Sequence, residues 1–498
     1  MKNHYDTGHL QEHLKTRSAR GGLATLAAQG LKFIVNLTGI FALSRLLAPD
    51  DFGLIAMVTS FTGIVVLLKD MGLSAATVQS TAITSSQVTT LFWVNAGVSG
   101  LISVALAISA PLFVKFYGRP EVGSIIIASA AGFFVGGLGV QHQALLSRQM
   151  EFVRLAAVDF SSILLSTILG IGLARAGAGY WSLVGMQASA AITSTVGLWI
   201  ASRWVPGKPK LDRSAFAMLN FGARLTVGNL LNYTSRNADN ILIGRFWGSE
   251  SLGFYFRAYQ LLMLPLSQIS GPISAVAIPA LSRLTDLPER YRAAYLQIIN
   301  RVLLITIPLI VFLMASADLL IDLALGSKWA GAVPLFIWLS VIGVTQPLSN
   351  SCGWLFISQG RSRDFMRQAL IDCLLSLIAI VGGLPWGAVG VASSYSISGL
   401  LLRAPVLFWL TGRKGPVTTT DLYGALFGAL PIATAVGVVT WLTKPHLAFM
   451  PIPLQMAVLS AFAAGVSLGW MMASAKGRLL VRESIAMLRK SIDKASCD

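Results

Sequence analysis

The chain is a succession of apolar blocks, each about twenty residues long, with short polar segments between them. A block of this length crosses a hydrocarbon core about 30 Å thick as a helix. A membrane barrel would instead need short segments in which polar and apolar residues alternate. The run Ile125–Val135 has no such alternation. The pattern therefore predicts an all-α polytopic membrane protein with about fourteen transmembrane helices.

Composition agrees with this prediction. Of the 498 residues, 54% are hydrophobic and only 12% are charged, whereas a soluble domain has about 25% charged residues. The net charge of +17 does not indicate a nucleic-acid-binding protein, because no basic patch interleaved with aromatic residues accompanies it. The basic residues lie mostly in alternate short loops, as they do on the cytoplasmic side of membrane proteins.

This charge asymmetry predicts the topology. Loops that contain Lys208, Lys210 and Arg213, and both polar termini, belong to the basic side. We therefore expect a bacterial inner membrane protein with cytoplasmic termini and an even number of helices. The apolar stretch after the N-terminal tail has no small-residue cleavage site, so we interpret it as a first transmembrane helix that is not removed.

An internal repeat at a shift of 200 residues suggests two halves. The first copy is SRLLAPDDFGLIAM (Ser44–Met57) and the second is GRFWGSESLGFYFR (Gly244–Arg257). A chance match between two helix–turn–helix segments is the alternative. The repeat predicts two parallel six-helix repeats and two C-terminal helices. The expected parts are a cytoplasmic tail (1–20), an N-lobe (21–205), a C-lobe (206–412), two further helices (413–475) and a cytoplasmic amphipathic tail (476–498).

Polar residues inside the spans are the candidates for function, because they are costly at membrane depth. In the first helix Gln29, Lys32 and Asn36 share one face. In the seventh helix Asn229, Asn232 and Arg236 occupy the matching positions 200 residues later. We predict that these faces line a substrate cavity, while interhelical hydrogen bonds that only hold the bundle together remain the alternative.

Further charges lie in the second half and in two other helices. Arg257 and Arg301 are predicted to face the interior, where guanidinium groups suit an anionic phosphate. Asp239 either neutralises Arg236 or binds a coupling ion when substrate occupies the arginine. Asp159 and Asp372 are also candidate ion-coupling residues, and each could instead cap a neighbouring helix.

No enzyme is predicted. The sequence has no GxSxG, Walker or HExxH motif, no close carboxylate pair within a span, and no CxxC pair. We therefore predict no catalytic residue, no metal site and no cofactor beyond a coupling ion, H⁺ or Na⁺. His142 near a helix end is interpreted as structural. The segment Arg478–Lys494 has an apolar face and is predicted to lie on the anionic cytoplasmic leaflet.

A longer stretch carries a family resemblance. NADNILIGRFWGSESLGFYFRAYQLLMLPLSQISGPISAVAIPALSRL (Asn237–Leu284) resembles the Wzx-type polysaccharide flippases of the multidrug/oligosaccharidyl-lipid/polysaccharide (MOP) exporter superfamily. The branch for colanic acid and rhizobial exopolysaccharide export is the most similar. The segments LSRLLAPDDFGLIAMVTSF (Leu43–Phe61) and DMGLSAA (Asp70–Ala76) fit the same family.

The resemblance implies a function. Such proteins move undecaprenyl-diphosphate-linked oligosaccharide repeat units of exopolysaccharide, capsule, O-antigen or lipopolysaccharide type across the inner membrane, by ion-coupled alternating access. Membrane lipids and possible polysaccharide polymerase and export proteins are the implied partners. The alternatives are a lipid II or multidrug transporter of the same superfamily, a membrane glycan polymerase or ligase, and a structural scaffold. A multidrug exporter would need acidic cavity residues, and an enzyme would need a large external loop.

Overall fold

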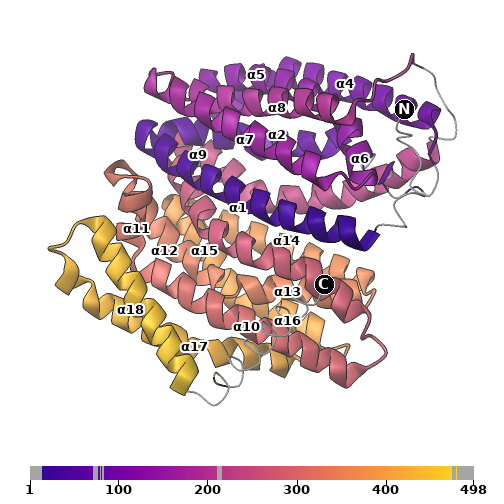
Figure 1. The fold of residues 1–498 in the computed structure, drawn as a ribbon. Helices are drawn as coiled ribbons and strands as arrows, with labels where there is room; N and C mark the ends of the chain where they lie inside the picture. The colour runs from indigo at the N-terminus through magenta and orange to yellow at the C-terminus, as the bar shows by residue number, and fades with distance from the viewer. Residues whose placement is uncertain are drawn as a thin grey trace. The chain divides into compact units, whose positions relative to one another are not determined.

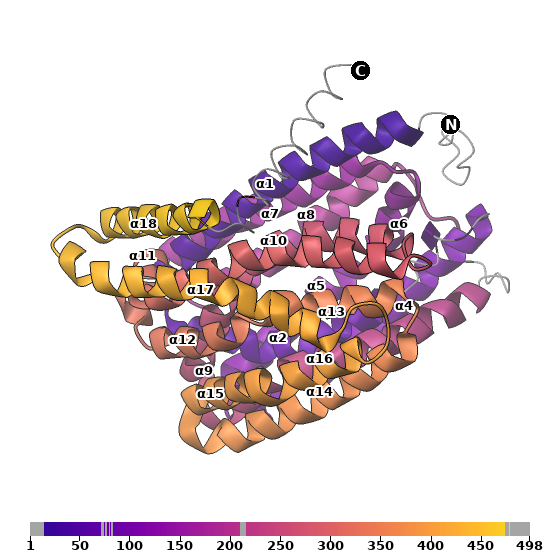
Figure 2. The same ribbon diagram turned by 90° about the horizontal axis from the view of Figure 1, so that it is seen from below.

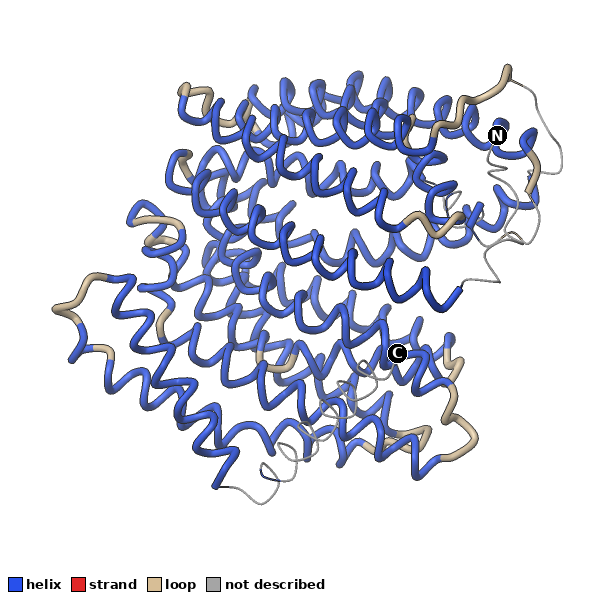
Figure 3. Tube along the Cα trace, viewed as in Figure 1, coloured by secondary structure: helices blue, strands red, loops and turns tan. Residues whose placement is uncertain are grey.

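The computed structural model describes residues 14–70, 83–209 and 216–473, together with positions 74, 77, 78, 80 and 478. Side chains of residues 14–28, 64, 66–70, 216–232 and 234–236 are outside this description. Every regular element in the described residues is a helix, as Figure 3 shows. The predicted amphipathic tail, 476–498, lies outside the described residues apart from position 478. The contacts divide the chain into two units, Met1–Phe256 and Arg257–Asp498.

The first unit contains α1 (Leu14–Leu46), α2 (Pro49–Asp70), α4 (Ser85–Tyr117), α5 (Pro120–Gly137), α6 (Val140–Arg148), α7 (Phe152–Arg175), α8 (Trp181–Ser202) and the part of α9 (Phe216–Ser282) up to Phe256. Within it α7 packs against α1 and α8, while α5 packs against α2, α4 and α8 (Figure 1). Thr84 begins α4 with a capping box to Gln87, and Gly118 ends it in the left-handed conformation at φ 70°.

The second unit begins within α9 and continues through α10 (Pro288–Ala315), α11 (Ala317–Ala324), η3 (Ser327–Trp329), α12 (Ala332–Gly343), α13 (Gln346–Ser358), α14 (Ser362–Gly383), η4 (Leu384–Trp386), α15 (Gly387–Ser398), the π-helix η5 (Gly399–Arg403), α16 (Ala404–Gly412), α17 (Thr419–Thr443), η6 (Pro445–Leu447) and α18 (Ile452–Ala473). Helix α17 lies beside α10 and α18, and α14 beside α15 (Figure 2).

Ten helices among the described residues are long and apolar enough to cross a membrane. Helix α9 has 67 residues and changes direction at Gly248, whose φ is 81°. At 1.5 Å per residue it is about 100 Å long, far more than one crossing of a core about 30 Å thick. The all-α membrane fold is confirmed, whereas the number fourteen stays a prediction.

Buried aromatic residues show how polar groups are accommodated in both units. In the first unit the His142 ring is fully buried, lies 4.4 Å from the Trp199 ring, and its Nδ1 lies 2.8 Å from the Ser202 hydroxyl. In the second unit the buried hydroxyls of Tyr291 and Tyr295 each bond to a serine hydroxyl, at 2.6 and 2.7 Å. His142 is thus part of the packed core, which agrees with its structural interpretation.

The two copies of the repeat pack against each other inside the first unit. A Cβ atom on Gly53 would overlap the carbonyl of Ser249, and one on Gly253 would overlap the carbonyl of Pro49. Pro49 and Ser249 are themselves 200 residues apart. The contact is therefore reciprocal under the shift found in the sequence, which a chance match would not produce.

Hydrogen bonds also connect the two copies of the repeat at this contact, which is called the crossing below. Arg119, which precedes α5, donates to both carboxylate oxygens of Asp50 at 3.2 and 2.8 Å and to the Ser249 hydroxyl at 3.0 Å. Ser249 in turn donates to Asp50. Hydrogen bonding to Asp50 is the main reason why the pKa of the Arg119 guanidinium lies above its ordinary value.

The crossing gives a first prediction. Gly53→Ala and Gly253→Ala should each lower the melting temperature, because a methyl group has no space between the backbones. The expected loss is about 1–3 kcal/mol, as for other overpacked sites. Gly97→Ala in α4 is the control, since nothing lies near the position of its Cβ. Equal melting temperatures for the three variants would contradict this prediction and would mean that the two backbones can move apart at little cost in stability.

Candidate functional site

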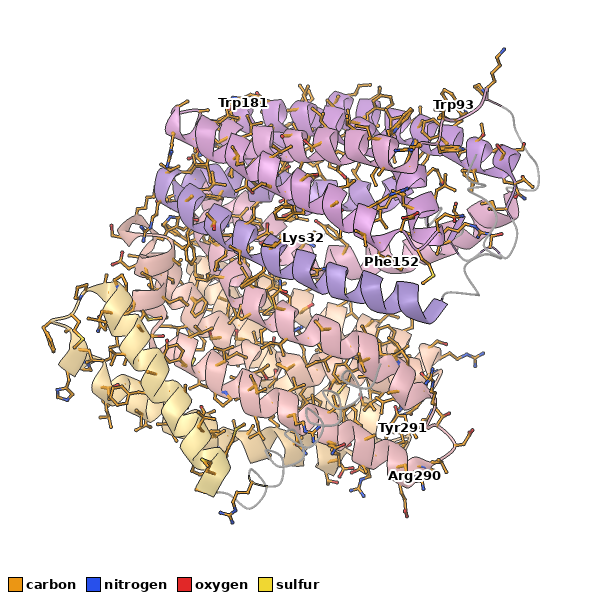
Figure 4. The ribbon with its side chains drawn as sticks, in the orientation of Figure 1. Lys32, Trp93, Phe152, Trp181, Arg290 and Tyr291 are labelled. Carbon is orange, nitrogen blue, oxygen red and sulfur yellow. The ribbon has the colours of Figure 1, made fainter. Side chains whose placement is uncertain are left out.

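Lys32 is held by a carboxylate from another helix. Its ammonium group lies 2.6 Å from Oδ2 of Asp159, so the ion pair joins α1 to α7 (Lys32 is labelled in Figure 4). The lysine side chain is 15% exposed, and the aspartate side chain is half-exposed. The sequence singled out both residues but gave them separate roles. In the structure Asp159 is the ion-pair partner of Lys32 and does not cap a neighbouring helix.

The rest of the two predicted polar faces is only partly described. Gln29 and Asn36 are exposed on the same helix as Lys32. Their exposure agrees with a face open to solvent or substrate. The side chains of Asn229, Asn232 and Arg236 lie outside the described residues. The match between the two faces therefore stays a prediction.

Asp239 is buried and has a partner that the sequence did not indicate. The hydroxyl of the buried Tyr255 donates to Asp239 Oδ2 at 2.6 Å, and the backbone N–H of Asn240 lies 2.8 Å from Oδ1. The tyrosine follows the break at Gly248, so this bond joins the two parts of α9 within the first unit. The Arg236 side chain that was expected to pair with Asp239 is outside the described residues.

Arg257 and Arg301 do not lie on the exposed surface. Arg257 is only 5% exposed and donates to the amide oxygen of Gln260, and Arg301 is half-buried on α10. This placement agrees with the predicted interior orientation. Their roles in substrate binding stay predictions.

Asp372 also forms an ion pair, and its partner is a cation that the sequence reasoning missed. Nε and Nη2 of Arg403 lie 2.8 and 3.3 Å from the two carboxylate oxygens. The guanidinium carbon lies 4.3 Å from the centre of the Tyr395 ring, and Nη2 also donates to the Tyr395 hydroxyl at 3.2 Å. Asp372 therefore pairs with a cation and does not cap a helix.

Arg403 was missed because it was grouped with the basic residues of the loop that follows. The structure places it at the end of the π-helix η5, with an 11% exposed side chain. A π-helix is rare and frequently marks a functional position. A polar residue directly after the apolar run Leu400–Leu402 was the available signal.

The two aspartates occupy equivalent positions in a second internal repeat. The segments RQMEFVRLAAVD and RSRDFMRQALID share the pattern Arg, two residues, an acidic residue, Phe, one residue, Arg, one residue, Ala, two residues and Asp. It runs from Arg148 to Asp159 and from Arg361 to Asp372. In both copies the first arginine donates to a backbone carbonyl that is distant in the sequence, Arg148 to Thr77 and Arg361 to Leu410.

The paired cations are not equivalent under this repeat. Lys32 comes from α1 and Arg403 from the segment between α15 and α16. Each unit thus places one aspartate at the same point of a related helix and neutralises it with a cation from a different helix. In each unit, separation of the ion pair frees a carboxylate and a cation, and the cation can then bind an anion. No step in this arrangement requires covalent chemistry.

A model of the polysaccharide biosynthesis protein family matches residues 42–334. The chain belongs to this family. The resemblance to Wzx-type proteins seen in the sequence is thereby confirmed.

The relatives that match this chain have low sequence identity to it but align with most of its length. The teichuronic acid biosynthesis protein TuaB of Bacillus subtilis is 30% identical, over 59% of this chain and 62% of TuaB. The chain thus spans less than two thirds of the length of that relative. The lipopolysaccharide biosynthesis protein WzxC of Escherichia coli is 25% identical, with 78% of each chain covered. The succinoglycan biosynthesis transport protein ExoT of Rhizobium meliloti is 23% identical, over 72% and 71% of the two chains.

Solved structures identify the fold. The lipid II flippase MurJ in an inward closed conformation superposes with a TM-score of 0.70 at 14% identity, over 90% of this chain and 97% of MurJ. An inward-facing multidrug transporter of the MATE family in the MOP superfamily gives 0.61 at 16% identity, over 81% and 99%. This protein therefore has the same fold as the MOP transporters and is a multi-pass membrane protein. The two solved structures are described as a flippase and a transporter.

Proposed function

We propose that this protein is a flippase for polyprenyl-diphosphate-linked oligosaccharide repeat units. Its family membership, and the names of relatives such as WzxC and ExoT, support a role in moving polysaccharide precursors across the membrane. The observation that carries the proposal is the presence of little-exposed cations on the apolar helices of a transporter fold. Lys32, Arg257 and Arg403 are all buried or nearly so.

The chemistry of the substrate fits these cations. A diphosphate carries negative charge that arginine and lysine bind through charge-assisted hydrogen bonds. A cation kept in an apolar membrane protein is costly and is a functional candidate by default. A ligand that binds one conformation more tightly than another shifts the equilibrium between them, which is the requirement for alternating access.

The proposal extends to coupling, partners and location. Asp159 and Asp372 are the proposed ion-coupling groups, with H⁺ or Na⁺ as the coupling ion and no other cofactor. A polysaccharide polymerase and export proteins are the proposed partners. The protein is proposed to lie in the bacterial inner membrane with both termini in the cytoplasm.

Complementation tests the function. A strain that lacks its own repeat-unit flippase should regain surface polysaccharide when this chain is expressed with the matching glycosyltransferases. Spheroplasts of the uncomplemented strain should contain lipid-linked repeat units that a lectin cannot reach from outside. Accumulation that persists at normal expression of this protein would overturn the proposal for that substrate class.

Topology gives a separate prediction. Reporter fusions after Lys208 and after Lys494 should both show cytoplasmic activity, because basic loops stay on the cytoplasmic side. A fusion after Lys115, in a segment assigned to the opposite side, is the control and should report the periplasm. A periplasmic reporter after Lys494 would require an odd number of helices and contradict the two six-helix repeats.

A further inference from the structure

A groove lies between α5 and α8 in the first unit, and neither Lys32 nor Asp159 lines it. It has a volume of about 250 Å³ and runs along the second half of α5, the start of α6 and most of α8. Drug-sized sites occupy about 300–1,000 Å³, so the groove suits a small group rather than a whole repeat unit. Its lining includes Ser129, Phe133, Gly136, Gln143, Gln187 and Ser194, together with further glycine, alanine and aliphatic positions.

The lining is polar without being charged. The amides of Gln143 and Gln187 are exposed and form no hydrogen bond within the described part of the chain. Ser129 and Ser194 add hydroxyls, whereas the Thr195 hydroxyl already donates to the carbonyl of Val135 at 3.1 Å. No lysine, arginine, aspartate or glutamate lines it. A diphosphate would find no counter-charge here.

Comparison of the two repeats explains why this groove is open. The break between α5 and α6, at positions 138 and 139, corresponds to the break between α12 and α13, at positions 344 and 345, and aligns Gly136 with Ile342. The segments YWSLVG (Tyr180–Gly185) and PWGAVG (Pro385–Gly390) align Ser194 with Gly399. In the second unit the side chain of Ile342 packs directly where a Cβ of Gly399 would lie. The equivalent place in the first unit has Gly136 and Ser194, and both residues line the groove.

We propose that the α5–α8 groove binds a neutral sugar ring of the lipid-linked oligosaccharide. This inference rests on the proposed flippase function and names a second part of the substrate. Amides and hydroxyls donate and accept hydrogen bonds as sugar hydroxyls do, and the Phe133 ring offers an apolar face. Glycine and alanine positions let a ring approach the helix backbones. An acyl chain in the groove would leave the two amides without partners, which is costly in an apolar surrounding.

The test uses the full-length protein in lipid nanodiscs and two photoreactive probes. One probe is octyl glucoside with a diazirine in its chain, and the other is octyl phosphate with the same diazirine. Peptide mapping should find glucoside adducts on α5 and α8, and free glucose-headed detergent should compete. Equal labelling of the groove by both probes would identify an alkyl-chain site and overturn the proposal.

Variants make the test specific to the groove. Gly136→Ile with Ser194→Gly should fill it with the packing that Ile342 and Gly399 have in the second unit, so the protein should fold. Glucoside labelling should fall by about tenfold, as expected when one or two hydrogen bonds and the space are lost. Ala131→Ile on an exposed part of the same helix is the control. Unchanged labelling in the filled variant would overturn the proposal.

A second pair of variants removes hydrogen bonding with little change in volume. Gln143→Leu and Gln187→Leu should each weaken competition by glucoside severalfold while the melting temperature stays at the wild-type value. Measurement of polysaccharide export distinguishes the groove proposal from the flippase proposal. If the wild-type protein restores export and the filled variant exports equally well with unchanged labelling, the groove proposal fails and the flippase proposal stands. If the wild-type protein never restores export, the flippase proposal fails whatever the labelling.

Discussion

Polysaccharide export is expected to be lost when Lys32 or Arg236 is replaced by alanine, although both variants should still insert and fold. Lys32 is nearly buried and held by Asp159 at 2.6 Å. A hydrogen bond between charged groups contributes about 1.5–3 kcal/mol, which corresponds to a loss of about tenfold to a hundredfold in substrate affinity. Arg236→Lys should keep part of the activity, because the charge remains but the two-pronged geometry is lost.

A double variant separates binding from packing at the Lys32 site. Lys32→Ala alone leaves the Asp159 carboxylate without its cation, so loss of export by that variant has two possible causes. Lys32→Ala with Asp159→Ala removes both charges and should recover normal expression and melting temperature. Export should remain absent in this double variant, since the diphosphate still lacks its cation. Full export by the double variant, measured as surface polysaccharide at normal expression, would show that the pair only holds α1 to α7.

Helix positions could be predicted from the sequence because lipid allows few alternatives. A chain that crosses the membrane must satisfy its own backbone, so apolar length alone locates the spans. The repeat that relates Gly53, in α2, to Gly253, in α9, was also visible in the sequence, and the structure gives it a physical reason. Each glycine faces a carbonyl of the other copy so closely that no Cβ fits.

Partners of the charged residues could not be predicted in the same way. Asp159 lies 127 residues from Lys32, and no local spacing rule relates residues that far apart. Tyr255 reaches Asp239 only because α9 changes direction at Gly248. The repeat that relates Asp159 to Asp372 was present in the sequence and was overlooked, because its shift differs from the 200 residues that align the first repeat.

The α5–α8 groove was beyond sequence reasoning for a different reason. Ser129 and Ser194 are small hydroxyl residues in apolar spans, where serine commonly bonds to its own helix backbone. Only the packed counterpart in the second unit, Ile342 against Gly399, indicates that the space beside Gly136 and Ser194 is unusual. The amides of Gln143 and Gln187 were visible in the sequence, but their approach to one groove depends on how the two helices pack.

Arg403→Ala is expected to have the second large effect, on stability and export together. The arginine holds α14 through Asp372 and stacks on Tyr395. Breaking a fully buried ion pair costs about 3–5 kcal/mol, and the cost here should be smaller because the Asp372 side chain is 35% exposed. Thermal unfolding of the purified protein should show this as a lower melting temperature than that of Arg363→Ala, a control at an exposed position.

Replacing both Arg403 and Asp372 distinguishes a role in stability from a role in transport. Arg403→Met with Asp372→Leu exchanges the pair for apolar side chains, which often restores or raises stability. We expect the melting temperature to recover and export to remain absent, since Asp372 is the proposed coupling group in the second unit. Asp372→Asn should retain the fold, because Arg403 can still bond to the amide oxygen, and it should also lack export. Export at the wild-type level by either variant would assign Asp372 to packing alone and leave Asp159 as the proposed coupling residue.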